Sequence, residues 1–389
     1  MKMKRSLKHL TFRIMPEFIL KKIQDRRSEK QYPRIIYNLG IDIKQQPKVL
    51  FSYLPNYLFM ENWSRQYGTR HVECAAFVKA LLNKECCVDI CDCNNEKGIR
   101  SDYDYIIGFG PAFRRARFLN PTAKSILYLT EKTPDFSYKK EKERIDYFYE
   151  RHQIKKGFSR SGQFFKNDDF VGLDMCIMIG NQSDLNLLPG GIKSLAIAPT
   201  GLKNELINHN NRHYKSAKKH FLWLGSSGAI HKGLDILIDV FRKHPELTLH
   251  IVGMHWSDRP LMNRFLVENT IDYGYMNIGS KEFAAIVEKC AYCISPSCSE
   301  AVSTSVITAM NHGLIPLVSE ESSFDLDDIG ETLTDFHLDY IEGVVMKWSQ
   351  ADDLYLEQLR DSVLQITQKK YSLSTYSNTI RAIINEFIM

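Results

Sequence analysis

Short apolar runs alternate with segments of helical periodicity along most of the chain. Residues 48–54 (KVLFSYL) predict a buried strand, residues 72–83 carry apolar side chains at helical spacing, and residues 87–91 predict the next strand. A strand, a loop, a helix and a strand in this order form the building block of a parallel, doubly wound sheet. The pattern therefore predicts an α/β fold.

The same alternation continues to the end of the chain and gives two such units. Further strands are predicted at residues 105–109, 125–129, 175–179, 194–198, 221–224, 247–252, 275–278, 292–295 and 314–318. Helices are predicted at residues 135–151, 234–243, 281–291, 304–311, 351–369 and 375–387. We therefore expect two Rossmann-like domains that face a cleft.

Changes in composition suggest where these domains begin and end. Residues 1–46 form a basic arm, in which lysine and arginine interleave with apolar side chains and Pro16 interrupts any single helix. Such an arm either contacts an anionic membrane surface or is solvated or packed on a domain. The expected domains span residues 47–203 and 204–374, and a C-terminal helix at 375–389 packs back on the first domain.

Composition and charge exclude several other classes of protein. A length of 389 residues suits two domains, and the net charge of +5 is too small to indicate a nucleic-acid partner. We find neither an apolar run of about 18 residues nor the apolar core of a signal peptide. Nine cysteines without a framework indicate reduced thiols. We expect a cytoplasmic protein, with peripheral contact at the inner face of the membrane as an option.

The turn after the predicted strand at 221–224 favours a bound phosphate. Gly225, Ser226, Ser227 and Gly228 are small enough for a phosphate to approach the backbone amides, and Lys232 adds a positive charge just before the helix. The spacing differs from that of a Walker A loop. The alternative interpretation is an ordinary turn with a surface lysine.

A second strand-to-helix junction, at residues 296–304, favours a sugar beside that phosphate. Ser303 or Thr304 is a good N-cap, and the helix start there suits an anion. Glu300 precedes it and would repel phosphate, but its carboxylate can accept hydrogen bonds from a pair of sugar hydroxyls. The alternative interpretation is an acid that caps the helix.

Taken together, these residues resemble the donor-binding domain of glycosyltransferases with the GT-B fold, in the retaining group called family 4 (glycosyl transferases group 1). The family's late motif is Pro-Ser, two residues, Glu, seven residues, Glu-Ala-Met and then Gly-x-Pro. Its positions are matched here by Ser297, Glu300, Ala309, Met310 and Gly313, and Pro316 comes one place late. The turn at 198–201 resembles the family's Pro-Asn-Gly turn between the domains.

The resemblance implies a role for each residue of the second domain. Lys232 would hold the diphosphate, Glu300 would bind hydroxyls of the transferred sugar, and backbone amides of Ala301, Val302, Ser303 and Thr304 would cradle both. Two positions depart from the family. Thr308 replaces the glutamate that holds the ribose, and its hydroxyl can supply one such hydrogen bond but not a charge-assisted pair. Ser226 replaces an arginine that often follows the first glycine. Arg70 of the other domain could then share the phosphate charge.

The first domain offers weaker candidates. Family members carry a histidine after a central strand, and Glu131 stands at the corresponding place as a candidate catalytic residue. Arg70 and His71, predicted in the loop after the first strand, face the expected cleft. The alternative interpretations are a solvated acid for Glu131 and a structural histidine for His71.

We predict no metal site and no cofactor beyond the donor substrate. The cysteines clustered at residues 86–93 lack the paired spacing of a zinc knuckle, and the aspartates at 325–328 lack the spacing of a calcium loop.

The expected function is the transfer of a sugar from a nucleotide diphosphate-sugar to a hydroxyl of a glycan or lipid-linked acceptor. The resemblance implies retention of configuration, independence of metal and a place in cell-surface polysaccharide biosynthesis. Two alternatives stay open: a sugar-nucleotide epimerase of the same fold, and a non-catalytic protein that binds sugar nucleotides or glycans.

Overall fold

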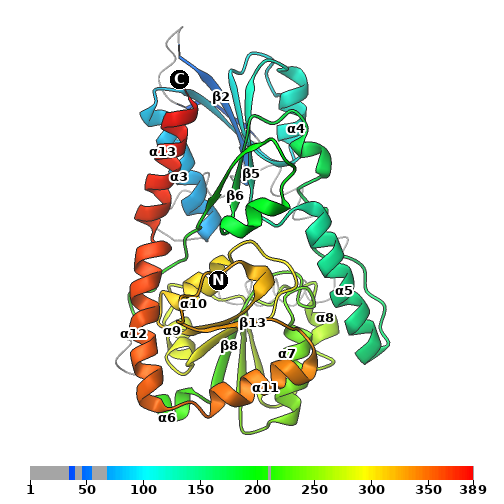
Figure 1. Ribbon diagram of the computed structural model, residues 1–389, viewed down its shortest axis with the longest axis vertical. Coiled ribbons are helices and arrows are strands. Elements are labelled where there is room, and N and C mark those ends of the chain that lie inside the picture. The colour runs from blue at the N-terminus through cyan, green and yellow to red at the C-terminus, as the bar shows by residue number, and fades with distance from the viewer. Residues whose placement is uncertain (1–34, 40–45, 55–67, 209–211, 389) are drawn as a thin grey trace, which may run out of the picture.

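Two parallel sheets, one after the other along the chain, form the two α/β domains (Figure 1). The computed structural model describes residues 35–39, 46–54, 68–208 and 212–388. The predicted α/β fold with two Rossmann-like domains is confirmed. Most predicted strands are found within a residue or two of their predicted bounds.

The first sheet has the strand order β1-β3-β2-β4-β5-β6-β7. All neighbouring strands are parallel except β1, which runs antiparallel to β3. The strands are β1 (Ile35–Leu39), β2 (Lys48–Tyr53), β3 (Cys87–Asp92), β4 (Tyr105–Gly108), β5 (Lys124–Leu129), β6 (Met175–Ile179) and β7 (Lys193–Ile197). The helices of this half are α3 (Thr69–Asn83), α4 (Gly110–Leu119) and α5 (Pro134–His152).

The second sheet is parallel throughout, in the order β10-β9-β8-β11-β12-β13. Its strands are β8 (His220–Leu224), β9 (Thr248–Val252), β10 (Thr270–Gly274), β11 (Tyr292–Ser295), β12 (Ile315–Ser319) and β13 (Glu331–Leu333). The helices of this half are α6 (Tyr214–Ala217), α7 (Leu234–Lys243), α8 (Arg259–Met262), α9 (Lys281–Val287), α10 (Thr304–Met310), α11 (Leu338–Ser349), α12 (Asp353–Lys370) and α13 (Leu373–Phe387).

Two predicted elements are corrected by the structure. The strand expected at residues 275–278 is β10, which lies earlier because Thr270 and Ile271 pair in register with Leu249 and His250 of β9. Residues 35–39 were predicted to belong to the basic arm, but they form the edge strand β1, with Ile35 paired to Cys91. Of the rest of that arm, residues 1–34 and 40–45 lie outside the described residues.

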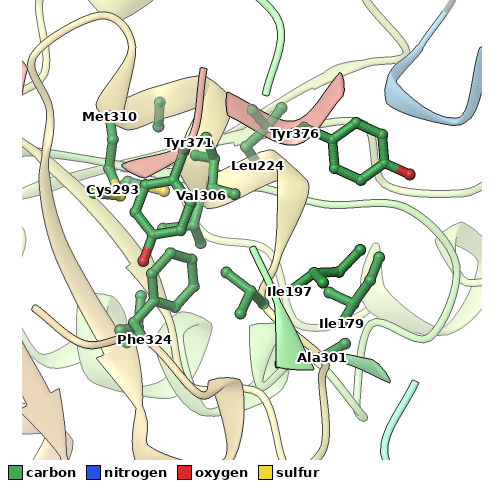
Figure 2. Close-up of a cluster of buried hydrophobic side chains, with 14 of the residues drawn as sticks. Ile179, Ile197, Leu224, Cys293, Ala301, Val306, Met310, Phe324, Tyr371 and Tyr376 are labelled. Atoms are coloured by element: carbon green, nitrogen blue, oxygen red, sulfur yellow. The ribbon is translucent and has the colours of Figure 1, made fainter. Parts of the chain in front are cut away.

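Apolar side chains fill both domains and the space between them. Strands β2 and β8 are fully buried at Val49, Leu50, Phe221 and Leu222, as expected for parallel strands covered on both faces. Figure 2 shows that the same buried cluster contains residues from both sheets, including Ile179 of β6 and Leu224 of β8. The two sheets therefore share apolar contacts at the base of the cleft.

Helices on two sides connect the domains (Figure 1). On one side α5 runs along the second domain, where Arg151 forms ion pairs with Asp235 and Asp239 of α7. On the other side α12 leads into α13, which packs against α3 of the first domain. This arrangement holds the carboxyl ends of the two sheets face to face.

Candidate functional site

A cavity of about 420 Å³ lies between the domains. It is bounded by segments that follow the carboxyl ends of strands in both sheets, where open α/β sheets usually bind ligands. The cavity is lined by these predicted site residues: Gly225, Ser226, Ser227, Lys232, Glu300, Ala301, Val302, Ser303, Thr304, Thr308 and, from the first domain, Glu131. Arg70 lines it as well.

The turn after β8 is shaped by its glycines. A Cβ atom at Gly225 would lie 2.2 Å from the Trp223 ring, and Gly228 has a φ of +86°, so neither position accepts a larger residue without strain. The backbone N–H groups of Gly228 and Ala229 donate to the Asp258 carboxylate, at 2.9 and 3.3 Å. A phosphate on this turn would therefore rely on residues 225–227 and on Lys232.

Lys232 is buried at the second-domain wall of the cavity. Its ammonium group forms an ion pair with the Glu300 carboxylate. Burial lowers the pKa of Lys232 well below its ordinary value, and the Arg160 guanidinium lowers it further, whereas contact with Glu300 favours the charged form. The two residues that were predicted to bind phosphate and sugar thus contact each other directly.

The first residues of α10 also line the cavity on the second-domain side. Ser303 is its N-cap residue, and the Ser303 hydroxyl contacts that of Ser305 at 3.0 Å. The Thr304 hydroxyl accepts a hydrogen bond from Thr69 of the first domain at 3.2 Å. This contact crosses the cleft and links the first turns of α3 and α10.

Thr308, at the position of the family's second glutamate, is buried and already hydrogen-bonded. Its hydroxyl accepts from the backbone N–H of Leu202 at 3.0 Å and donates to the Thr304 carbonyl at 2.7 Å. The turn between the domains packs tightly there, since a Cβ at Gly201 would lie 2.7 Å from the Thr308 nitrogen. Thr308 therefore joins the turn between the domains to α10.

The first-domain wall contains two charged residues that the sequence analysis missed. Arg160 lines the cavity, and its Nη2 contacts the Glu131 carboxylate at 3.3 Å. Glu73 of α3 also lines the cavity and accepts a hydrogen bond from the Tyr53 hydroxyl at 2.6 Å. Burial raises the pKa of Glu73 to about 7. Neither residue belongs to a recognisable motif, and only its position in the folded chain reveals it.

Arg70 and His71 lie in the first turn of α3, which begins at Thr69, and not in a loop as predicted. Arg70 is exposed at the cavity, whereas His71 is buried and is absent from the cavity lining. Burial lowers the pKa of His71. The prediction that His71 faces the cleft is therefore wrong, because the helix starts three residues earlier than the apolar spacing indicated and turns this side chain inward.

Within the described ranges, no cluster of three or more His, Cys, Asp or Glu residues is placed to hold a metal ion. The clustered cysteines at residues 86–93 are buried in and beside β3. Asp327 forms an ion pair with Lys370. Within the same ranges, no helix has the length and apolar character needed to cross a bilayer.

Two Rossmann-like domains whose sheets face a common cleft define the GT-B fold, and the structural neighbours share it. Sucrose-phosphate synthase of Thermosynechococcus elongatus superposes with a TM-score of 0.61 at 12% identity, covering 88% of this chain and 99% of that protein. HepE of Anabaena, in complex with UDP-glucose, gives 0.55 at 12% identity, covering 87% and 100%.

TarM of S. aureus, as the G117R mutant in complex with fondaparinux, α-GlcNAc-glycerol and UDP, gives a TM-score of 0.54 at 16% identity. The superposition covers 75% of this chain but only 57% of TarM. No protein-family profile and no curated protein sequence matches the chain. At these identities the likeness shows the fold alone.

Proposed function

We propose that this protein is a glycosyltransferase that moves a sugar from a nucleotide diphosphate-sugar to a hydroxyl of a glycan or lipid-linked acceptor. The observation that carries the proposal is the pairing of buried Lys232 with Glu300 at the cleft, beside the open turn at 225–227. Two structural neighbours with the same fold support it, since HepE forms a complex with UDP-glucose and TarM forms one with UDP.

Each side chain at the second-domain wall has a role in this proposal. Lys232 binds the diphosphate and balances the charge that develops on it as the sugar leaves. Such a charge acts strongly here because Lys232 is buried and water is largely excluded. Glu300 accepts hydrogen bonds from hydroxyls of the transferred sugar, and the Lys232–Glu300 pair opens as the donor enters.

Backbone amides at residues 301–304 complete the donor site, and the first domain supplies the acceptor side. Glu131 lies opposite, within the cavity lining, where it would contact the sugar or the incoming hydroxyl. Retention of configuration, independence of metal and a place in cell-surface polysaccharide synthesis are further parts of the proposal that follow from the family resemblance. The basic arm would bring a cytoplasmic enzyme to a lipid-linked acceptor at the membrane surface.

A second candidate function is the binding of a sugar nucleotide without catalysis. The observation in its favour is Thr308, because its hydroxyl is engaged by Leu202 and Thr304 and replaces a carboxylate that would hold the ribose. A protein that lacks that carboxylate has one fewer charge-assisted contact to its nucleotide.

Incubation with a panel of mass-tagged nucleotide sugars, with and without a glycan and lipid extract, separates these functions. Transfer of the tagged sugar to the extract, with release of nucleoside diphosphate, is the expected result. Binding without release would favour the non-catalytic protein, and isomerisation of the donor without transfer would favour an epimerase. Failure of every nucleotide sugar to bind would overturn the proposal.

A further inference from the structure

Ser226 stands where the resembled family often carries an arginine. An arginine of the first domain, Arg160, lines the cavity beside this turn. We infer that Arg160 reaches across the cleft to contact the diphosphate of the donor, opposite Lys232. The inference rests on the proposed function, and it adds a phosphate contact from the first domain that no motif in the second domain supplies.

A buried carboxylate fixes the backbone from which Arg160 projects. Glu141 of α5 accepts hydrogen bonds from the N–H groups of Ser159, Arg160 and Ser161, at 2.6, 3.1 and 2.8 Å. Burial alone would raise the pKa of Glu141, but His231 and the donors at 159–161 bring it below its ordinary value. The Glu141 carboxylate thus fixes the backbone at residues 159–161, and this backbone supports the side chain of Arg160.

The side chain of Arg160 extends over the turn predicted to bind phosphate. A Cβ atom added at Gly228 would lie 3.1 Å from Cγ and 3.3 Å from Cδ of Arg160. The aliphatic part of the side chain therefore packs on the second domain, although its backbone belongs to the first. Arg160 lines the same cavity as Ser226, Ser227 and Lys232.

The hydrogen-bonding capacity of the guanidinium is not used up. Its Nη2 contacts Glu131 at 3.3 Å. Its Nε is buried and has no hydrogen-bond partner in the part of the chain that the structure describes. The terminal amino groups contact Glu131 alone among the described residues, so they retain N–H donors that a phosphate oxygen in the cavity could accept from.

Each wall of the cavity supplies a cation that could contact an anion lying between them. The Arg160 guanidinium lies close enough to Lys232 to lower the pKa of that lysine. Their carboxylate partners, Glu131 and Glu300, belong to the same domains as the cations that they contact. A nucleoside diphosphate has two phosphoryl groups and can place one at each cation, whereas a monophosphate has a single phosphoryl group to share between the two walls.

Calorimetric titration of the full-length protein with UDP, ADP and GDP, and with the matching monophosphates, tests the inference. In Arg160→Met we expect the preferred nucleoside diphosphate to bind about 10- to 100-fold more weakly, as for the loss of a charge-assisted contact. Binding of the monophosphate should change by less than about threefold. Arg160→Lys should recover part of the loss, because it keeps the charge without the planar fork.

Arg381→Met is the matched control, since Arg381 is exposed on α13. Equal dissociation constants for the diphosphate in wild type and Arg160→Met would overturn the inference and leave the proposed function standing. An equal loss for diphosphate and monophosphate would also overturn it, because a merely structural role would weaken both. If the wild-type protein binds none of these nucleotides, the proposed function itself fails.

Discussion

The two walls of the cleft are built in different ways. The second-domain wall consists of two continuous strand-to-helix junctions, at residues 225–232 and 300–308, which lie side by side because β8 and β11 are neighbours. The first-domain wall is assembled from side chains far apart in the chain, including Tyr53, Glu73, Glu131 and Arg160. A wall of local junctions suits an invariant group such as a diphosphate, and an assembled wall can vary with the acceptor.

The largest effect is expected at the second-domain wall, from Lys232→Ala. Loss of the buried charge should reduce sugar transfer by about 100- to 1,000-fold, the usual cost of removing one group that stabilises charge in a transition state. Transfer is measured by the release of nucleoside diphosphate. Lys155→Ala is the matched control, because Lys155 is exposed. Near-normal sugar transfer by Lys232→Ala would contradict the proposal that Lys232 binds the diphosphate.

Glu300→Gln separates sugar recognition from phosphate recognition on the same wall. The amide keeps the shape of the side chain but loses the charge that pairs with Lys232 and that is proposed to bind sugar hydroxyls. We expect transfer to fall about 10- to 100-fold, as for a lost charge-assisted hydrogen bond. The affinity of Glu300→Gln for the nucleoside diphosphate alone should stay within about threefold of wild type. If that affinity falls as much as transfer does, Glu300 contacts the nucleotide and not the sugar.

The first-domain wall should respond to pH through Glu73. Its folded-state pKa of about 7 lies above its ordinary value of 4.5, so the folded protein binds the proton more tightly than the unfolded chain. The stability from this group is fully present below pH 4.5 and is lost as pH rises to about 7, by up to about 3 kcal/mol.

Glu73→Gln should remove this dependence. Urea unfolding at pH 5 and pH 8 measures it, with exposed Glu150→Gln as the control. We expect Glu73→Gln to be more stable than wild type at pH 8 and similar to it at the lower pH. A variant that is no more stable at pH 8 would show that the Glu73 carboxylate is satisfied in its charged form.

Thr308→Val gives the smallest effect and tests whether this residue contacts the ribose. The substitution leaves the Leu202 N–H without its acceptor, so the protein should lose about 1–2 kcal/mol of stability in urea unfolding. Nucleoside diphosphate affinity should stay within about threefold, because the hydroxyl already serves Leu202 and Thr304. A tenfold loss of affinity would restore the predicted contact with the ribose.

The difference between the walls also explains what could be predicted from the sequence. Apolar runs and helical spacing identify the sheets, and the junctions at Lys232 and Glu300 are visible because each is continuous in the chain. Arg160 and Glu73 were missed because each acquires its neighbours only on folding: Arg160 contacts Glu131, and its loop is held by Glu141.

The surroundings of two single positions also depend on tertiary contacts. His71 was predicted to face the cleft because it follows the first strand in the sequence. The early start of α3 turns its side chain inward instead. The Thr308 hydroxyl accepts a hydrogen bond from the Leu202 N–H, a contact that the sequence does not show. In both cases a tertiary contact, invisible in local spacing, decides what the side chain does.

The most direct test of the central claim is a crystal structure with the preferred nucleotide sugar bound. The account predicts the diphosphate on the turn at 225–227, within hydrogen-bond distance of Lys232, with the sugar hydroxyls on Glu300 and the Lys232–Glu300 pair opened. A nucleotide bound outside this cleft, or one bound in it with Lys232 still paired to Glu300, would contradict it.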